Sequence, residues 1–511
     1  METVKKKYGL WTGIAMVVGI VIGSGVFLKA GPVLALSGGK LWVSLLAWLI
    51  GGIIMIASGF CFAIFSTKIT KFNGVIDYVE MSTNKKVAYG LSWLMTSLYY
   101  PTIASIVSVF ASAYFVDLIG CSEAIFGGPV GSIYQLLGSW QVYLIAFGFL
   151  TIFATLNYFA PKIAGKFQIS ATIIKLIPIF VIAIVGLFAS LFIKDGGIVN
   201  AFTSVGQKLN PETMTYEALS VNFGDAVRTT AFAYEGWVCA TMINAELKNS
   251  KKNLPRALVG GTIAIVVFYL IYYIGVSATI GNVDSLPGGA NTVVIEQGPN
   301  APLVIFNNIF GVVGEKIFTV FIIVSCLGTV NGVVLATVRG MATMAFRGQG
   351  IAPEKISRLS AKNNMPLLSC VMGYAYCVVL LGIWYLANNS ISVFKYLANM
   401  DAIVCALIYG CFIVMFVYMM RNFKELSVFK RYIMPIVAII GCSVFVLVGT
   451  GIFQMITGLI SGASDPYASL KEFGVWLVLC AVVMVPSIFF YKKDAMSPLD
   501  FAESEEIEEQ K

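Results

Sequence analysis

Long apolar runs are the feature of this sequence that most limits what it can fold into. Twelve of them follow one another along the chain, and each reaches the roughly 20 residues that an α-helix needs to cross a bilayer. Charged residues make up only 12% of the chain, whereas a soluble domain normally carries about 25%. We therefore expect an all-α polytopic membrane protein with 12 transmembrane helices. The expected spans are 10–36, 41–65, 88–119, 139–158, 167–193, 219–244, 256–281, 303–340, 366–387, 393–420, 432–455 and 472–491.

The basic residues are distributed unevenly between the two sides that these spans define. One alternate set of connecting segments, which includes both ends of the chain, carries 24 of the 34 lysines and arginines, and the opposite set carries five. Cytoplasmic loops are enriched in Lys and Arg. We therefore expect a multi-pass protein of the plasma (inner) membrane with both termini in the cytoplasm. The acidic segment 492–511 is typical of a solvated, solubilising tail.

The reactive residues exclude several classes of protein. The chain has no histidine, and nine of its ten cysteines fall inside apolar runs. Only Cys121 falls in a loop, on the outer side, so no disulfide framework is expected. Without histidine or a CxxC pair, a metal, haem or iron–sulfur site has almost no ligands, and no HExxH or GxSxG motif supports an enzyme. We expect no enzymatic activity, no cofactor and no bound metal.

The first span contains a glycine cluster that predicts a broken helix. Gly19 is followed by Gly23-Ser24-Gly25, and glycine in a helix interior is disfavoured by about 1 kcal/mol relative to alanine. Irregular backbone at membrane depth is tolerated where it lines a cavity, and the N-terminus of a restarted helix suits a carboxylate. Close helix packing is the alternative, and it accounts for Gly19 and Gly23 better than for Gly25.

The sixth span repeats this pattern about 210 residues later. The run Phe232-Ala233-Tyr234-Glu235-Gly236 places a carboxylate and a glycine in an apolar segment, and an ionisable residue inside the membrane is a functional candidate. Two glycine-interrupted spans at matching places in two halves are typical of an inverted-repeat transporter. The alternative for Glu235 is a buried pair with Arg228, seven residues earlier on the same helical face.

Two further charges are predicted at membrane depth. Lys175 lies nine residues from Lys166, about 13 Å along a helix, which is deep for a lysine that reaches the interface. Its ammonium needs acceptors, and the freed carbonyls of a broken helix supply them without a second charge. Asp401 is isolated in the tenth span in a similar way, and a structural bond to a neighbouring helix explains it equally well.

Five segments of the sequence resemble the amino acid–polyamine–organocation superfamily, and within it bacterial permeases and exchangers related to the L-type amino-acid transporters. They are Gly23–Phe27 (GSGVF), Phe232–Trp237 (FAYEGW), Glu246–Ala257 (ELKNSKKNLPRA), Ser325–Gly332 (SCLGTVNG) and Arg347–Pro353 (RGQGIAP). The resemblance covers spans 1 to 10 and implies a LeuT-like fold with broken helices 1 and 6. The implied divisions are a cytoplasmic N-terminus 1–9, inverted repeats 10–193 and 219–420, two further helices in 432–491, and the cytoplasmic tail 492–511.

The resemblance also implies roles for individual residues. The first break would receive the substrate carboxylate, the sixth-span break would receive the amino group, and Lys175 would occupy the place of a sodium ion. The substrate-binding residues would be Gly23, Ser24, Gly25, Phe232 as an aromatic lid, Ala233, Tyr234 and Glu235, with Asp401 and Thr329 as further candidates. The chain departs from the family pattern at Ile64 and at Phe72-Asn73-Gly74, near the cytoplasmic gate, and Glu235 replaces a small or neutral residue of many relatives.

These observations predict a secondary active transporter of amino acids or related amines that works by alternating access, as a sodium-independent exchanger. A proton-coupled amino-acid symporter is the alternative that the sequence leaves open. An ion channel is a distant third, because few polar residues in the spans are available to line a pore. The expected partners are the small-molecule substrate and the lipid bilayer, with no nucleic acid and no accessory subunit.

Overall fold

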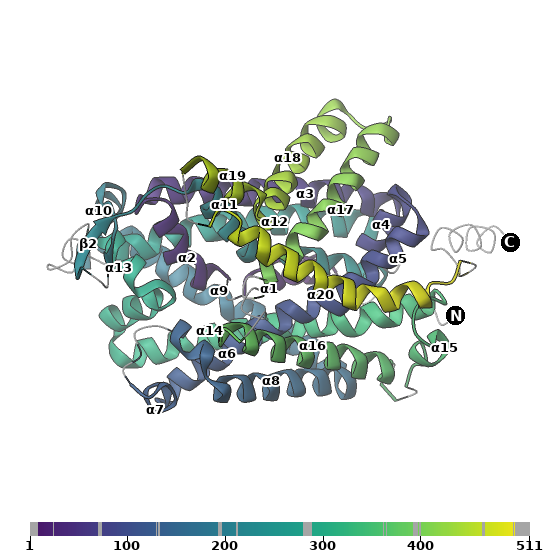
Figure 1. Cartoon of the computed structure of the whole chain (residues 1–511), viewed down its shortest axis with the longest axis horizontal. Coiled ribbons are helices and arrows are strands. Elements are labelled where there is room, and N and C mark those ends of the chain that lie inside the picture. The colour runs from purple at the N-terminus through teal and green to yellow at the C-terminus, as the bar shows by residue number, and fades with distance from the viewer. Residues whose placement is uncertain are drawn as a thin grey trace.

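The protein is an elongated bundle of helices, shown in Figure 1 as a computed structural model. The structure describes residues 9–23, 25–69, 74–128, 130, 133–192, 197–210, 213–279, 289–360, 362–363, 365–391, 397, 400–461, 465–493 and 495. Within them, ten helices are long and apolar enough to cross a membrane, or eleven if the bent pair in the first span counts as one. The chain is thus a polytopic helical membrane protein.

The first half of the chain forms helices that follow the expected spans closely. Their bounds are α1 Leu10–Val21, α2 Gly25–Leu36, α3 Leu41–Lys68, α4 Val75–Ser82, α5 Lys85–Leu94, η1 (a π-helix) Met95–Tyr99, α6 Tyr100–Leu118, α7 Ser122–Phe126, η2 (a 3-10 helix) Ile133–Gly138, α8 Trp140–Phe159, α9 Pro161–Phe192 and α10 Ile198–Thr203. Since α5, η1 and α6 form one continuous span, the predicted third span begins a few residues earlier than expected.

The second half departs from the expected spans in three places. Its elements are β1 Gln207–Asn210, β2 Thr215–Ala218, α11 Phe223–Ala233, η3 (3-10) Trp237–Glu246, α12 Ser250–Thr279, α13 Ala290–Gln297, η4 (3-10) Gly298–Asn300, α14 Ala301–Phe346, α15 Pro353–Ile356, α16 Leu367–Asn388, α17 Met400–Asn422, η6 (π) Phe429–Ile433, α18 Met434–Gly449, α19 Ile452–Ser461 and α20 Ala468–Phe490. The predicted sixth span is the short α11 followed by η3. The predicted eighth span contains a kink at Gly311 (φ +67°), which joins two helices within α14. The predicted eleventh span ends at α18, since Gly451 has φ +79° and a separate helix, α19, follows it.

The centre of the bundle is formed by the helices that carry the predicted site. Helix α12 packs on α1, α3 and α9, and α14 packs on α6 and α9. In the most apolar window of the α5–α6 span 83% of residues are buried, against 17% in α20, so α20 presents most of its surface outward. Figure 1 shows α4, α5 and α15 at one end of the molecule, and the β1–β2 hairpin with α10 and α13 at the other.

Candidate substrate and cation site

The predicted break in the first span is present. Helix α1 ends at Val21, Ile22 has the non-helical ψ of 87°, and α2 begins at Gly25 with its axis bent by 48°. Ser24 lies outside the described residues. Because a helix end leaves its last carbonyls without intrahelical partners, the break frees acceptors near the middle of the bundle.

Lys175 supplies donors to these carbonyls. It lies on α9, is 0% exposed, and its ammonium donates to the carbonyls of Gly19 at 2.6 Å and Ile22 at 2.5 Å. Gly328 on α14 faces the same ammonium, and a Cβ there would lie 3.5 Å from Nζ. The buried ammonium is therefore held by carbonyls at the end of α1. These are the acceptors that we expected for a lysine at this depth in a membrane span.

Helix α14 adds two hydroxyls to the same helix end. Ser325 donates to the carbonyl of Gly23 at 3.2 Å, and Thr329 donates to the carbonyl of Ile20 at 3.4 Å. A Cβ on Gly23 would lie 2.8 Å from the Thr329 hydroxyl, so this glycine also allows α14 to approach. Thr329, one of the candidates from the sequence, therefore lies at the first break. Ser325 lies at the same break.

The predicted break in the sixth span is also present, and it lies against the first. Helix α11 ends at Ala233, and Gly236 adopts φ +98° before the 3-10 helix η3, a conformation that glycine adopts without steric penalty. A Cβ on Gly236 would lie 2.8 Å from a methyl of Ile20, and one on Gly25 would lie 2.6 Å from the Cα of Ala233. Both interpretations of Gly25 thus have support, since it begins the restarted helix and permits close packing.

A single side chain connects the two breaks. Tyr269 on α12 is fully buried, and its hydroxyl lies 3.1 Å from the carbonyl oxygen of Val21 and 2.9 Å from that of Ala233. These are the last helical residues of α1 and α11. The hydroxyl therefore holds both broken helix ends at one point.

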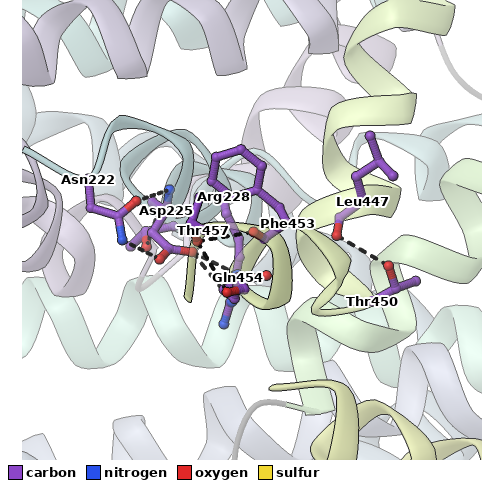
Figure 2. Close-up of polar contacts among 9 residues, drawn as sticks. Asn222, Asp225, Arg228, Leu447, Thr450, Phe453, Gln454 and Thr457 are labelled. Carbon is purple, nitrogen blue, oxygen red and sulfur yellow. Dashed lines mark hydrogen bonds and ion pairs between the residues drawn. The ribbon is translucent and has the colours of Figure 1, made fainter. Parts of the chain in front are cut away.

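Glu235 is bound by phenols and does not pair with Arg228. Its Oε2 accepts a hydrogen bond from Tyr99 on η1, and Tyr409 and Cys405 of α17 interact with the same carboxyl group. Arg228 instead lies 3.6 Å from Asp225, whose carboxylate also accepts from Asn222 and from Gln454 of α19 (Figure 2). The alternative interpretation of Glu235, a buried pair with Arg228, is therefore wrong.

Tyr234 points away from this carboxylate. Its hydroxyl donates to the backbone carbonyl of Trp48 on α3 at 2.9 Å, and its ring packs on Trp48 and Tyr269 with centroids 5.7 and 5.2 Å away. The backbones of Phe232 and Asp401 lie in α11 and α17, but their side chains are outside the described part of the structure. Among the sequence candidates, the structure thus brings Gly23, Gly25, Ala233, Thr329 and Lys175 together at the two breaks.

Three residues of the site are not among the candidates that the sequence singles out. Tyr99 and Tyr269 are two of 23 tyrosines, and Ser325 lies in the segment Ser325–Gly332 that resembles the family but has no role assigned to it there. Only their hydrogen bonds to a broken helix or to Glu235 distinguish them. In chemical terms the arrangement offers helix-end amides and carbonyls, a tethered cation and a buried acid. Within the described residues no three His, Cys, Asp or Glu gather to hold a metal.

Comparison with known proteins finds relatives that match most of the chain in sequence. The profile of the family described as "Amino acid permease" matches residues 8–491. The serine/threonine exchanger SteT of Bacillus subtilis (strain 168) is 30% identical over 377 residues, which cover 74% of this chain and 76% of that protein. The mouse b(0,+)-type amino acid transporter 1 is 25% identical over 366 residues, which cover 71% of this chain and 67% of that protein. The human cystine/glutamate transporter is 22% identical over 379 residues, which cover 74% of this chain and 68% of that protein.

Proposed function

This chain belongs to the amino acid permease family, which makes it a multi-pass membrane transporter and not an enzyme, and we propose that it is a sodium-independent amino acid exchanger. In this proposal it moves amino acids or related amines across the plasma membrane by alternating access. The observation that carries the proposal is the Lys175 ammonium on the freed carbonyls of α1. Two of the relatives named above, SteT and the b(0,+)-type transporter, are an exchanger and an amino acid transporter by name, which supports the substrate class.

The position of Lys175 supports sodium independence. A sodium ion bound at a helix end would be held by carbonyls and hydroxyls, the oxygen donors that hard cations prefer. The carbonyls of Gly19 and Ile22 already accept from the ammonium, and the Ser325 hydroxyl lies beside them. Because the ammonium repels a second cation, sodium binding at this site is electrostatically unfavourable.

The positions of the two breaks support a model in which each break binds a different group of the substrate. We propose that the first break, at Gly23, Ser24 and Gly25, receives the substrate carboxylate, because the N-terminus of a helix such as α2 favours anions. The freed carbonyls that follow Ala233 receive the amino group, with Phe232 as the aromatic lid. Tyr234 and Glu235 then shape the sixth-span side of the site.

Glu235 supports one alternative, a proton-coupled amino acid symporter. It is a carboxyl group 9% exposed in the interior of the bundle, with phenol and thiol groups around it. An acid in such a place that gained and lost a proton during the cycle would couple transport to pH without any histidine. If it stays ionised instead, it favours amines and cationic amino acids as substrates.

The remaining structural features of the proposal concern the fold and topology. We propose 12 spans in which α11 and η3 together form the sixth, and a LeuT-like arrangement with inverted repeats 10–193 and 219–420 and two further helices in 432–491. Both termini lie in the cytoplasm, and the transporter works without a cofactor, a nucleic acid or an accessory subunit.

One panel of uptake measurements in proteoliposomes tests this function. Labelled serine, threonine, lysine and cystine are offered to vesicles with and without internal amino acid, in sodium or choline buffer, with and without a pH gradient. Exchange predicts uptake that requires internal substrate and is equal in the two buffers. Uptake into empty vesicles that follows the pH gradient would favour the symporter, and a strict sodium requirement would refute the role of Lys175.

A further inference from the structure

The chain that follows α20 is attached to the end of α14. The side chain of Gln349, 4% exposed, donates to the backbone carbonyl of Lys492 at 2.7 Å and accepts from its backbone N–H at 2.9 Å. Two residues of α5 continue this contact, since Tyr89 donates to the carbonyl of Ser487 at 3.1 Å and Lys85 donates to that of Ala495. The chain therefore leaves the described structure at a fixed place.

An open cavity of about 640 Å³ lies at that place. Its lining includes Arg347, Gly348, Pro353, Glu354, Lys492 and Lys493. Lys492 and Lys493 are exposed, and so are Lys355 and Arg358 next to the cavity on and after α15. Glu354 is the one acid among the described residues of the lining, so the described part of the rim is basic.

The segment that continues from this rim is acidic. Residues 496–511 carry six carboxylate side chains and a single lysine, so their charge is opposite to that of the rim. Sixteen residues reach about 50 Å when extended, more than enough to fold back over the cavity. A short tether also holds the segment near the rim at an effective concentration of about 1 mM.

We propose that this cavity is the docking site of the chain's own acidic segment 496–511. The segment binds through its carboxylates to the basic rim formed by Lys492, Lys493 and the surface of α15. It is thus a ligand of the transporter as well as a solubilising tail.

The site of docking gives the segment a way to act on transport. Arg347 lines the cavity and is paired with the buried carboxylates of Asp77 and Glu80 on α4. Helix α4 in turn contacts η3, the second half of the broken span, where a Cβ on Gly74 would lie 2.2 Å from the Thr241 hydroxyl. A bound segment therefore restrains the end of α14 at the point where it holds α4. This consequence for exchange rests on the proposed function, whereas the binding itself does not.

Binding is measured with a variant that ends at Ala495 and a fluorescent peptide of residues 496–511, in detergent and without lipid. We expect saturable binding that weakens by about tenfold or more between about 0.01 M and 0.5 M salt, because salt screens exposed charges. A peptide with its glutamates changed to glutamine should not bind. Lys492→Glu with Lys493→Glu in the truncated protein should abolish binding, whereas the matched control Lys166→Glu, an exposed lysine at the start of α9, should not.

Two outcomes of the binding experiment would overturn the proposal. One is no saturable binding, or equal binding of the glutamine peptide. The other is binding of phosphatidylglycerol vesicles to the rim in a way that the peptide does not compete with, which would make the cavity a site for lipid headgroups.

Counterflow by the full chain and by the truncated variant then tests the effect on transport. We expect the truncated variant to exchange about two- to fivefold faster at low salt and at the same rate as the full chain at high salt. Equal rates at low salt would refute the restraint on α14. An absence of counterflow in both proteins would instead refute the proposed function, while the binding result would stand.

Discussion

Replacing Lys175 with methionine removes the tethered cation and keeps a side chain of similar length. The carbonyls of Gly19 and Ile22 lose donors at 2.6 and 2.5 Å, and both lie in the buried interior of the bundle. We therefore expect the end of α1 to lose its position, and substrate binding at the first break to weaken with it.

The magnitude follows from the two hydrogen bonds. A hydrogen bond to a charged group contributes about 1.5 to 3 kcal/mol, so two contribute about 3 to 6 kcal/mol. Desolvation of the ammonium opposes this contribution, and Ser325 still faces the carbonyl of Ile22 in the variant. A net loss of about 2 to 3 kcal/mol corresponds to a decrease of about 30- to 150-fold in apparent affinity.

Counterflow of labelled amino acid in proteoliposomes, over a range of substrate concentrations in sodium and in choline buffer, measures this change. The matched control is Lys166→Met on the same helix, where the side chain is exposed and little change is expected. Size-exclusion chromatography confirms that both variants are folded. A Lys175→Met protein with the affinity of the unchanged chain would refute the assignment of the ammonium as the structural cation.

Three further substitutions address the contact between the breaks and the buried acid. Tyr269→Phe removes the hydroxyl shared by both helix ends, and a loss of about 1 to 2 kcal/mol should raise the counterflow KM about 5- to 30-fold; an unchanged KM would show that the helix ends do not need it. Gly25→Ala places a methyl group 2.6 Å from the Cα of Ala233 and should reduce exchange about tenfold or more, whereas Gly148→Ala, where a Cβ meets nothing within 4 Å, should exchange normally. Glu235→Gln keeps the shape and should lower exchange of lysine relative to serine by about three- to tenfold; equal exchange of both substrates from mildly acidic to mildly alkaline buffer would make this carboxylate structural.

The breaks and the buried lysine were predictable from the sequence because their residue types are unusual inside an apolar helix. Gly23 and Gly25 lower helix propensity in an otherwise apolar run, and Lys175 is charged where its neighbours are not. A residue that is unfavourable in its local context needs a compensating partner elsewhere. The structure supplies these partners as the carbonyls of α1 and the packing of α11.

The partners themselves were not predictable, because they fit their local context. Tyr269 and Tyr99 are favourable residues in apolar helices, and nothing in their spacing indicates that their hydroxyls bind a broken helix end or an acid. The sequence does not predict the end of α18 either, because the residues after Gly451 are again apolar and continue the hydropathic pattern into α19. The 3-10 conformation of η3 likewise depends on its packing against α1 and α12. Contacts between segments so far apart cannot be inferred from the local sequence pattern.

The covalent attachment of the Lys175 ammonium has a thermodynamic consequence. A bound sodium ion leaves its site in every cycle and releases the free energy of its own gradient, but a side chain cannot leave. A cycle built on this tethered charge draws no work from an ion at that position. In the exchanger that we propose, the inward movement of one amino acid is therefore driven by the outward movement of another. The total number of amino acids in the cell is then conserved by the transporter. Net accumulation would have to come from a separate importer, and this protein would set only the composition of the pool.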